Sequence, residues 1–315
     1  MNKSAIIFGI KGYKLTNKEK KLFKKTKPWG IILFSRNIRD IHQLENLINE
    51  IRKTLNEKKY PILIDEEGGK VSRLKKIIDL STFSQNYFSK LFKSDKKLFY
   101  IVYKKYIDVI CDIFKSVGIN INIAPVLDVR RKKSHNIIGN RSFSENPKTV
   151  VQMGRLCVDF YEKNKIATVI KHIPGHGLSK CDSHFKMPKI TASKSELKKK
   201  DFLPFKYCPS FFAMTCHAVY NSYDRGNSAT HSKIIISKVI RSHINFKGIL
   251  ISDDISMKSL KYKLEKNALK ALNAGCNLVL HCNGNIKEMN RLSKVVPKID
   301  KFTQKKTSHF YKFLG

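Results

Sequence analysis

The 315-residue chain lacks several features that would assign it to a common class of protein. Its seven cysteines form no CxxC pair, which argues against a disulfide framework and favours a reducing compartment. No apolar run approaches the roughly 18 residues of a membrane span. The apolar stretch 5–10 is too short for a signal peptide. The sequence therefore predicts a cytoplasmic protein with no membrane partner.

Acidic residues are also scarce, at 25 against 62 basic residues, and the formal net charge is +37. A charge of this size invites a nucleic-acid-binding interpretation. However, arginine, which grips phosphates and base edges bidentately, accounts for only 11 of the 62 basic residues. A lysine excess of this kind is typical of a compositional bias. It predicts nonspecific adsorption to polyanions rather than a specific nucleic-acid partner, and a nucleic-acid-binding function stays as an alternative.

The glycine motifs of nucleotide-binding loops are missing, but eight short, continuously apolar runs are present. Such runs are typical of parallel strands that are buried on both faces. Segments with helical periodicity separate most of them. The predicted strands are 5–10, 30–35, 61–67, 121–129, 167–173, 211–220, 248–254 and 277–282.

The helical pattern is clearest in 41–58, and "DIHQ" (40–43) resembles a capping box at its start. Further helices are predicted at 98–116, 146–165, 232–245 and 263–275. This alternation predicts an α/β fold, a single-domain (β/α)8 barrel of TIM type over residues 1–297, followed by a basic C-terminal tail at 298–315. A doubly wound open sheet is the alternative, because periodicity does not prove closure.

Polar side chains gather where the predicted strands end, which is where barrel enzymes carry their active sites. The segment 174–192, after the fifth strand, is long for a βα connection and predicts a lid or binding loop. The polar strand-end residues are Asp65, Glu66, Glu67, Asp128, Lys171, His172, His217, Asp253, Asp254 and Asn283.

The stretch "KHIPGHGLSKCDSH" (171–184) resembles the signature of glycoside hydrolase family 3, in its branch of single-domain bacterial β-N-acetylglucosaminidases. Other blocks resemble that family in the same order. They are "ILIDEEGGKVSRL" (62–74), "IAPVLDV" (123–129), "IGNRSF" (138–143), "MTCHAVY" (214–220), "ISDDISM" (251–257) and "AGCNLVLHCN" (274–283). The resemblance covers roughly residues 3–290.

The resemblance implies a retaining exo-β-N-acetylglucosaminidase that acts on muropeptide fragments in peptidoglycan recycling. Retaining hydrolysis needs an ionised nucleophile and a group that donates and then accepts a proton. By the resemblance these are Asp253, with Asp254 as the competing candidate, and the loop residue His184, whose ring Asp182 orients. Lys171 is expected to favour the ionised form of Asp253. Adjacent residues of a strand point opposite ways, so only one of the two aspartates should face the sugar.

The resemblance also implies sugar contacts from Asp65, Arg73, Arg141, Lys171 and His172. His176 is expected to support the loop. No metal or organic cofactor is implied, and we expect a monomer whose partner is a carbohydrate.

Two positions depart from the family pattern. Glu66 stands where glutamine is typical, and Asn140 stands where an acidic residue is common. Rival interpretations remain: a metal enzyme with ligands from His172, His176, Asp182 and His184, a related β-glycosidase or glycoside phosphorylase with another sugar preference, or an inactive sugar-binding relative.

Overall fold

The computed structural model describes residues 2–131, 138–179 and 187–315. Eight parallel strands close into a barrel in the order β1-β2-β3-β4-β5-β7-β10-β11, so the predicted (β/α)8 barrel is confirmed and the open sheet is excluded. The strands are β1 (Ser4–Gly9), β2 (Pro28–Leu33), β3 (Ile62–Ile64), β4 (Ile121–Asn122), β5 (Ala167–Ile173), β7 (Phe212–Thr215), β10 (Ile249–Asp254) and β11 (Leu278–His281).

All eight predicted strands are present, although several are shorter than the apolar runs that predicted them. The strands other than β10 are buried along their whole length, and β10 is buried up to its last two residues. This explains the absence of polar alternation in the sequence.

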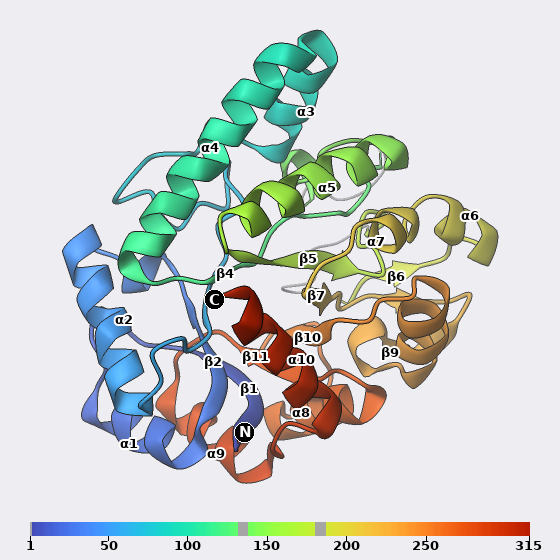
Figure 1. Ribbon diagram of the computed structural model, residues 1–315. Coiled ribbons are helices and arrows are strands. Elements are labelled where there is room, and N and C mark those ends of the chain that lie inside the picture. Colours follow the sequence, from blue (N-terminus) through green and yellow to red (C-terminus); the bar gives the residue numbers. More distant parts are fainter. Residues whose placement is uncertain (1, 132–137, 180–186) are drawn as a thin grey trace.

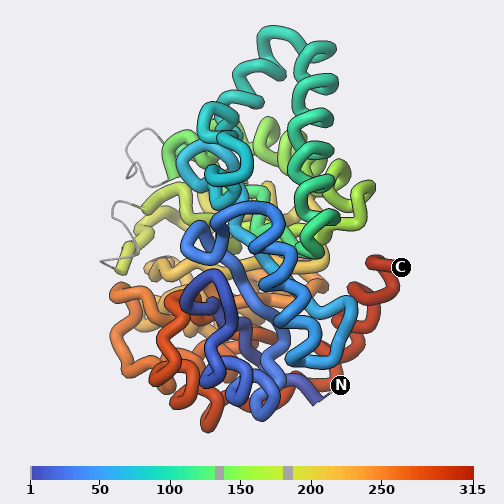
Figure 2. The backbone as a smooth tube through the Cα atoms, turned by 90° about the vertical axis from the view of Figure 1, so that its left-hand side faces the viewer, coloured from blue at the N-terminus to red at the C-terminus, as the bar shows by residue number. Residues whose placement is uncertain are grey.

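Helices surround the barrel (Figure 1). They are α1 (Asn17–Thr26), α2 (Ile41–Leu55), α3 (Gln85–Ser94), α4 (Lys96–Val117), α5 (Pro147–Lys163), α6 (Lys194–Lys199), α7 (Leu203–Tyr207), α8 (Leu264–Ala274), α9 (Ile286–Val295) and α10 (Lys301–Phe313). The segment Ile235–His243, within the predicted helix 232–245, has π-helical geometry. Helices α3 and α4 form a hairpin that projects from the rest of the molecule in both views (Figures 1 and 2).

The start of α2 shows how local sequence fixes a helix boundary. Asp40 is the N-cap, and its carboxylate accepts a hydrogen bond from the Gln43 N–H at 2.8 Å. The Gln43 side chain accepts from the Arg39 N–H at 2.7 Å and does not reach the Asp40 N–H, so the predicted capping box is only half formed. The apolar stripe faces inward and buries Leu44, Leu47, Ile48 and Ile51.

Helix α10 lies across the amino end of the barrel, opposite the carboxyl ends of the strands (Figure 1). The buried Phe310 ring packs against Trp29 and Phe212, which stand at the starts of β2 and β7. The indole Nε1 of Trp29 donates to Thr307 Oγ1 at 2.9 Å. The amino end is thereby covered, and residues 298–315 contain a helix that is packed against the barrel.

The sequence did not predict a second, three-stranded sheet made of β6 (Lys189–Ile190), β8 (Val219–Tyr220) and β9 (Asp224–Ser228). Two of its strands are two residues long, which is too short for any periodic pattern. Strand β8 is parallel to β6 and antiparallel to β9. In the described ranges, no helix combines the length and apolarity needed to cross a bilayer.

Candidate active site

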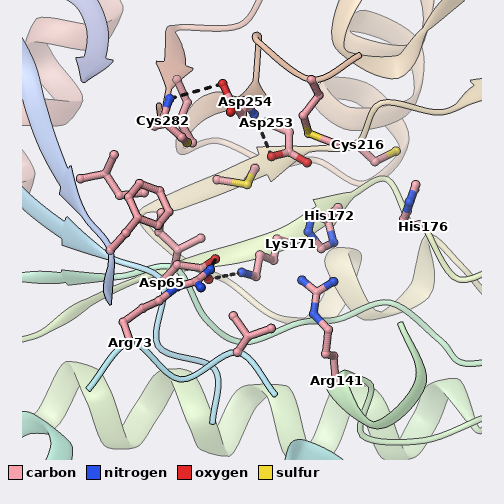
Figure 3. A pocket seen from close by; sticks show the side chains of 17 residues that line it. Asp65, Arg73, Arg141, Lys171, His172, His176, Cys216, Asp253, Asp254 and Cys282 are labelled. Carbon is pink, nitrogen blue, oxygen red and sulfur yellow. Dashed lines mark hydrogen bonds and ion pairs between the residues drawn. The ribbon is translucent and has the colours of Figure 1, made fainter. Parts of the chain in front are cut away.

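A cavity of about 220 Å³ opens at the carboxyl ends of the barrel strands (Figure 3). All five residues that were predicted to contact a sugar line it, as does the predicted nucleophile. The polar and titratable lining residues are Asp65, Arg73, Arg141, Lys171, His172, His176, Asp253 and Asp254, and the apolar walls come from Ile32, Phe34, Val71, Ile123, Met214, Met257 and Leu280, together with Cys216 and Cys282.

Asp253 and Asp254 both line the cavity, although adjacent residues of a regular strand point opposite ways. That Asp253 alone faces the sugar stays a prediction. The register of β10 against β11 shifts between Ile251 and Asp254, and this irregularity breaks the simple alternation of a strand. The two carboxylates differ in their partners. Asp254 accepts hydrogen bonds from the N–H and hydroxyl of Ser256 and from the Cys282 N–H, whereas Asp253 Oδ1 accepts from the Asp254 N–H at 2.8 Å. Asp254 therefore organises the strand end.

The surroundings of Asp253 favour its ionised form. Burial alone would raise the pKa of this carboxyl, but His217, His172, the Asp254 N–H and Lys171 together hold it below its ordinary value. The contribution of Lys171, which the sequence singled out, is smaller than those of the two histidines. An ionised carboxylate at the end of a rigid strand is suited to act as a nucleophile.

Asp65 and two cations form one wall of the cavity (Figure 3). Lys171 Nζ donates to Asp65 Oδ1 at 2.5 Å, and Arg73 Nη2 donates to Asp65 Oδ2 at 3.1 Å. Lys171 is almost fully buried, whereas the Asp65 side chain is 18% exposed toward the cavity. This wall offers both carboxylate acceptors and cationic donors, the groups that neutral sugar hydroxyls need.

Arg141 completes the cationic part of the lining and is held from behind by Glu67. Both Arg141 Nε and Nη2 donate to the Glu67 carboxylate, at 2.7 and 2.8 Å. The same carboxylate pairs with Lys171 Nζ. Glu67 thus links two residues that face the cavity, although it does not itself line it.

Asp128 contacts both described histidines of the segment 171–179, His172 through its ring and His176 through its backbone N–H. Its Oδ2 lies 2.7 Å from His172 Nδ1, and its Oδ1 accepts from the His176 N–H at 2.6 Å. Asp128 is fully buried, yet His172 and His176 hold the pKa of its carboxyl below the ordinary value. Burial lowers the pKa of His176 to about 4, and neither of its ring nitrogens has a hydrogen-bond partner in the described ranges.

The glycines of this segment bring its backbone close to neighbouring chain. Gly175 adopts a φ of 135°, a backbone conformation that residues with a side chain rarely adopt. A Cβ atom on Gly177 would lie 1.9 Å from the Val129 carbonyl oxygen, so no side chain fits there. The Lys171–His172 and Ile173–Pro174 peptide bonds are cis.

Other strand-end residues named from the sequence lie behind or beside the cavity. Glu66 is buried, and its carboxylate accepts hydrogen bonds from Gly68, Ser72, Arg73 and Leu74. His217 is buried, with Nδ1 2.8 Å from Thr230 Oγ1 and Nε2 3.0 Å from the Asp254 carbonyl oxygen. Asn283 lies at the surface and donates to Glu288.

The predicted acid/base His184 and its partner Asp182 lie outside the described residues. So does part of the rival metal-ligand set. Within residues 2–131, 138–179 and 187–315, no group of three or more histidine, cysteine or acidic side chains is placed to hold a metal ion.

Sequence reasoning missed the apolar walls of the cavity. Phe34, Cys216 and Cys282 each directly follow the last residue of a barrel strand, the same position that identified the polar residues. Their position therefore carried a signal, but apolar side chains at strand ends do not differ in type from those of the core. Met214 and Met257 carried no comparable signal.

Comparison with known proteins agrees with this geometry. Residues 4–309 match the family described as glycosyl hydrolase family 3 N terminal domain. A beta-hexosaminidase of Photobacterium profundum is 30% identical over 319 residues, which cover 98% of this chain and 92% of that protein. A beta-hexosaminidase of Actinobacillus pleuropneumoniae is 32% identical over 284 residues, 88% of this chain and 81% of the relative.

Among solved structures, NagZ from Neisseria gonorrhoeae in complex with N-trifluoroacetyl-D-glucosamine superposes with a TM-score of 0.87 at 28% identity. The match covers 100% of this chain and 90% of that one. The resemblance found in the sequence motifs is confirmed: the chain belongs to glycosyl hydrolase family 3.

Proposed function

We propose that this chain, a β-N-acetylhexosaminidase of glycosyl hydrolase family 3, removes terminal non-reducing N-acetylglucosamine from its substrate with retention of configuration. The observation that carries the proposal is the cavity itself, in which the ionised Asp253 faces a wall of carboxylate and cationic groups suited to sugar hydroxyls. Its volume of about 220 Å³ is below the range of about 300–1,000 Å³ typical of ligand pockets. A single sugar ring at a chain end suits a cavity of this size.

In the proposed first step, Asp253 attacks the anomeric carbon and the bond to the leaving oxygen breaks, giving a glycosyl ester. The imidazolium of His184 donates its proton to the leaving oxygen, and Asp182 orients the ring. In the second step, neutral His184 takes a proton from water. That water oxygen attacks the anomeric carbon from the opposite face, and the Asp253 carboxylate leaves. Two inversions give retention.

Asp65, Arg73, Arg141, Lys171 and His172 are proposed to hold the sugar ring. Asp65 accepts from hydroxyl groups, while the cations donate to hydroxyl and acetamide oxygens. Support comes from their shared position on the cavity wall, opposite Asp253 in Figure 3.

We propose muropeptide fragments as the substrate class, in cytoplasmic peptidoglycan recycling, with a monomeric enzyme. The structure from Neisseria gonorrhoeae is a complex with N-trifluoroacetyl-D-glucosamine, which supports the sugar preference. The six cysteines within the described residues are free thiols, which supports a reducing compartment.

The test is hydrolysis of p-nitrophenyl β-N-acetylglucosaminide and the plain β-glucoside by wild type and Asp253→Asn, with and without EDTA. We expect selective, chelator-resistant turnover that falls on the order of 10⁴-fold in the variant. NMR should detect the β-anomer first, and initial α-anomer would refute double displacement. Adding phosphate separates the phosphorylase alternative, since phosphorolysis would yield the sugar 1-phosphate. Lack of turnover by folded wild type would overturn the proposed function.

A further inference from the structure

Glu67 lies behind the cavity and contacts two of the cations that face it. Its side chain is 1% exposed. Oε2 accepts from Arg141 Nε at 2.7 Å and Oε1 accepts from Arg141 Nη2 at 2.8 Å, so the carboxylate holds the guanidinium through two donors. Oε1 also pairs with Lys171 Nζ.

These contacts extend a row of alternating charges along one wall of the cavity. In spatial order the row is Arg73, Asp65, Lys171, Glu67 and Arg141. Four of its members line the cavity, and Glu67 is the one that does not. Burial would raise the pKa of the Glu67 carboxyl, but Arg141 and Lys171 hold it far below its usual range. Glu67 is therefore an anion that acts on the site through its neighbours.

The physical need for such an anion follows from the two cations. Lys171 is almost fully buried and Arg141 is largely buried. Both side chains are positively charged, so they would repel each other without a shared counter-charge. Lysine has a flexible stem with rotatable donors, and the rigid arginine fork matches a carboxylate that meets it bidentately. One carboxylate at this place both neutralises and aims them.

We infer that Glu67 is a positioning residue for sugar binding, which fixes Lys171 Nζ and the Arg141 guanidinium in the orientation that donates to the sugar. Glu67 itself does not touch the sugar. The inference rests on the proposed function, because the sugar contacts of Lys171 and Arg141 belong to that proposal.

The experiment compares wild type and Glu67→Gln in two assays: calorimetric binding of N-acetylglucosamine and hydrolysis of the p-nitrophenyl glycoside. The amide keeps the shape of the side chain but removes the charge and one acceptor. We expect the Kd for N-acetylglucosamine and the KM to rise about 10- to 100-fold, the effect of losing a charge-assisted hydrogen bond.

A series of glycosides, each lacking one ring hydroxyl, separates positioning from general destabilisation. When the missing hydroxyl is one that Lys171 or Arg141 holds, the glycoside should bind wild type much more weakly than the complete glycoside does. For Glu67→Gln the same change should weaken binding only slightly. Unchanged penalties at every hydroxyl, together with a raised KM, would assign Glu67 a merely structural role and overturn the inference.

Two variants serve as controls. Glu57→Gln breaks a comparable ion pair, Glu57 with Lys3 at 2.8 Å, which lies outside the cavity lining, and it should leave the Kd for N-acetylglucosamine unchanged. Glu67→Asp keeps the charge but shortens the side chain by one methylene, and it should raise Kd less than the glutamine variant does. If Glu67→Gln does not fold, Glu67→Asp must still raise the Kd for N-acetylglucosamine at least about threefold. This threshold is smaller than the effect expected from losing one charge-assisted hydrogen bond.

The outcomes distinguish this inference from the proposed function. Suppose that wild type hydrolyses the glycoside, and that folded Glu67→Gln or Glu67→Asp binds N-acetylglucosamine as tightly as wild type does. This result would overturn the inference and leave the proposed function standing. Wild type that neither hydrolyses the glycoside nor binds N-acetylglucosamine would overturn the proposed function and the inference with it.

Discussion

Replacing Glu66 by glutamine should make the stability of the protein less dependent on pH. The Glu66 carboxylate is 1% exposed and accepts four hydrogen bonds. Oε2 accepts from the Arg73 N–H at 2.6 Å, the Leu74 N–H at 3.0 Å and the Ser72 hydroxyl at 3.3 Å, and Oε1 accepts from the Gly68 N–H at 3.2 Å. A glutamine whose amide oxygen replaces Oε2 keeps the three hydrogen bonds to that oxygen and loses the hydrogen bond from the Gly68 N–H.

The magnitude follows from the cost of burying the charge. Burial raises the pKa of Glu66 from 4.5 to about 7, and the four hydrogen bonds offset only part of this effect. The difference of 2.5 pH units, at about 1.4 kcal/mol per unit, corresponds to roughly 3 kcal/mol. Because the folded pKa lies above the unfolded one, this stability is present below pH 4.5 and is lost as pH rises through 7.

Glutamine has no such dependence. Its lost hydrogen bond to Gly68 costs about 1 kcal/mol at every pH. We therefore expect Glu66→Gln to be about 1 kcal/mol less stable than wild type at pH 4.5 and about 2 kcal/mol more stable at pH 8.

The assay is urea unfolding at pH 4.5, 5.5, 7 and 8, with Glu45→Gln on the exposed face of α2 as the matched control. The free-energy difference between the control and wild type should change little with pH. A difference between Glu66→Gln and wild type that stays constant over this range would refute the reasoning, since it would place the titration of Glu66 at its unfolded value.

Three further predictions concern separate parts of the molecule. His184→Ala should lose about 10²- to 10⁴-fold in kcat on glycosides with poor leaving groups and less on p-nitrophenyl glycosides; equal losses would contradict the acid role. Asp128→Asn should raise KM about tenfold in steady-state assays, because an amide cannot serve both His172 Nδ1 and the His176 N–H as acceptor; an unchanged KM would refute this. Phe310→Ala should cost about 3–5 kcal/mol in urea unfolding while leaving KM unchanged; a raised KM would show that α10 reaches the site.

Much of the barrel was predictable because its strands are local patterns. Runs such as 5–10 are apolar along their length, and burial on both faces leaves that mark in any parallel strand. The small sheet escaped prediction because β6 and β8 are only two residues long, and because β6 finds its partner across a long separation, with Lys189 opposite Val219. The irregular end of β10 was not predicted for a related reason. Its register shift is defined by the pairing with β11, and the sequence of β10 alone does not show it.

The site shows the same division. Position at the carboxyl end of a strand identified Asp65, Lys171, His172 and Asp253 as cavity residues, because all carboxyl ends of a barrel meet at one face. The same rule also selected Asn283, which lies at the surface bonded to Glu288. Strand-end position tells which face a residue reaches, and it does not tell whether the side chain turns inward.

The three consecutive acids Asp65, Glu66 and Glu67 separate what each level decides. The sequence by itself determined that three carboxylates follow the third strand, and its motifs determined the family. Only the tertiary structure decided their separate tasks: Asp65 faces the cavity, Glu66 binds the backbone of its own loop, and Glu67 holds Lys171 and Arg141. The physical reason is that the charge and direction of each carboxylate depend on partners that the barrel brings together, and Lys171 and Arg141 lie 104 and 74 residues from Glu67 along the chain.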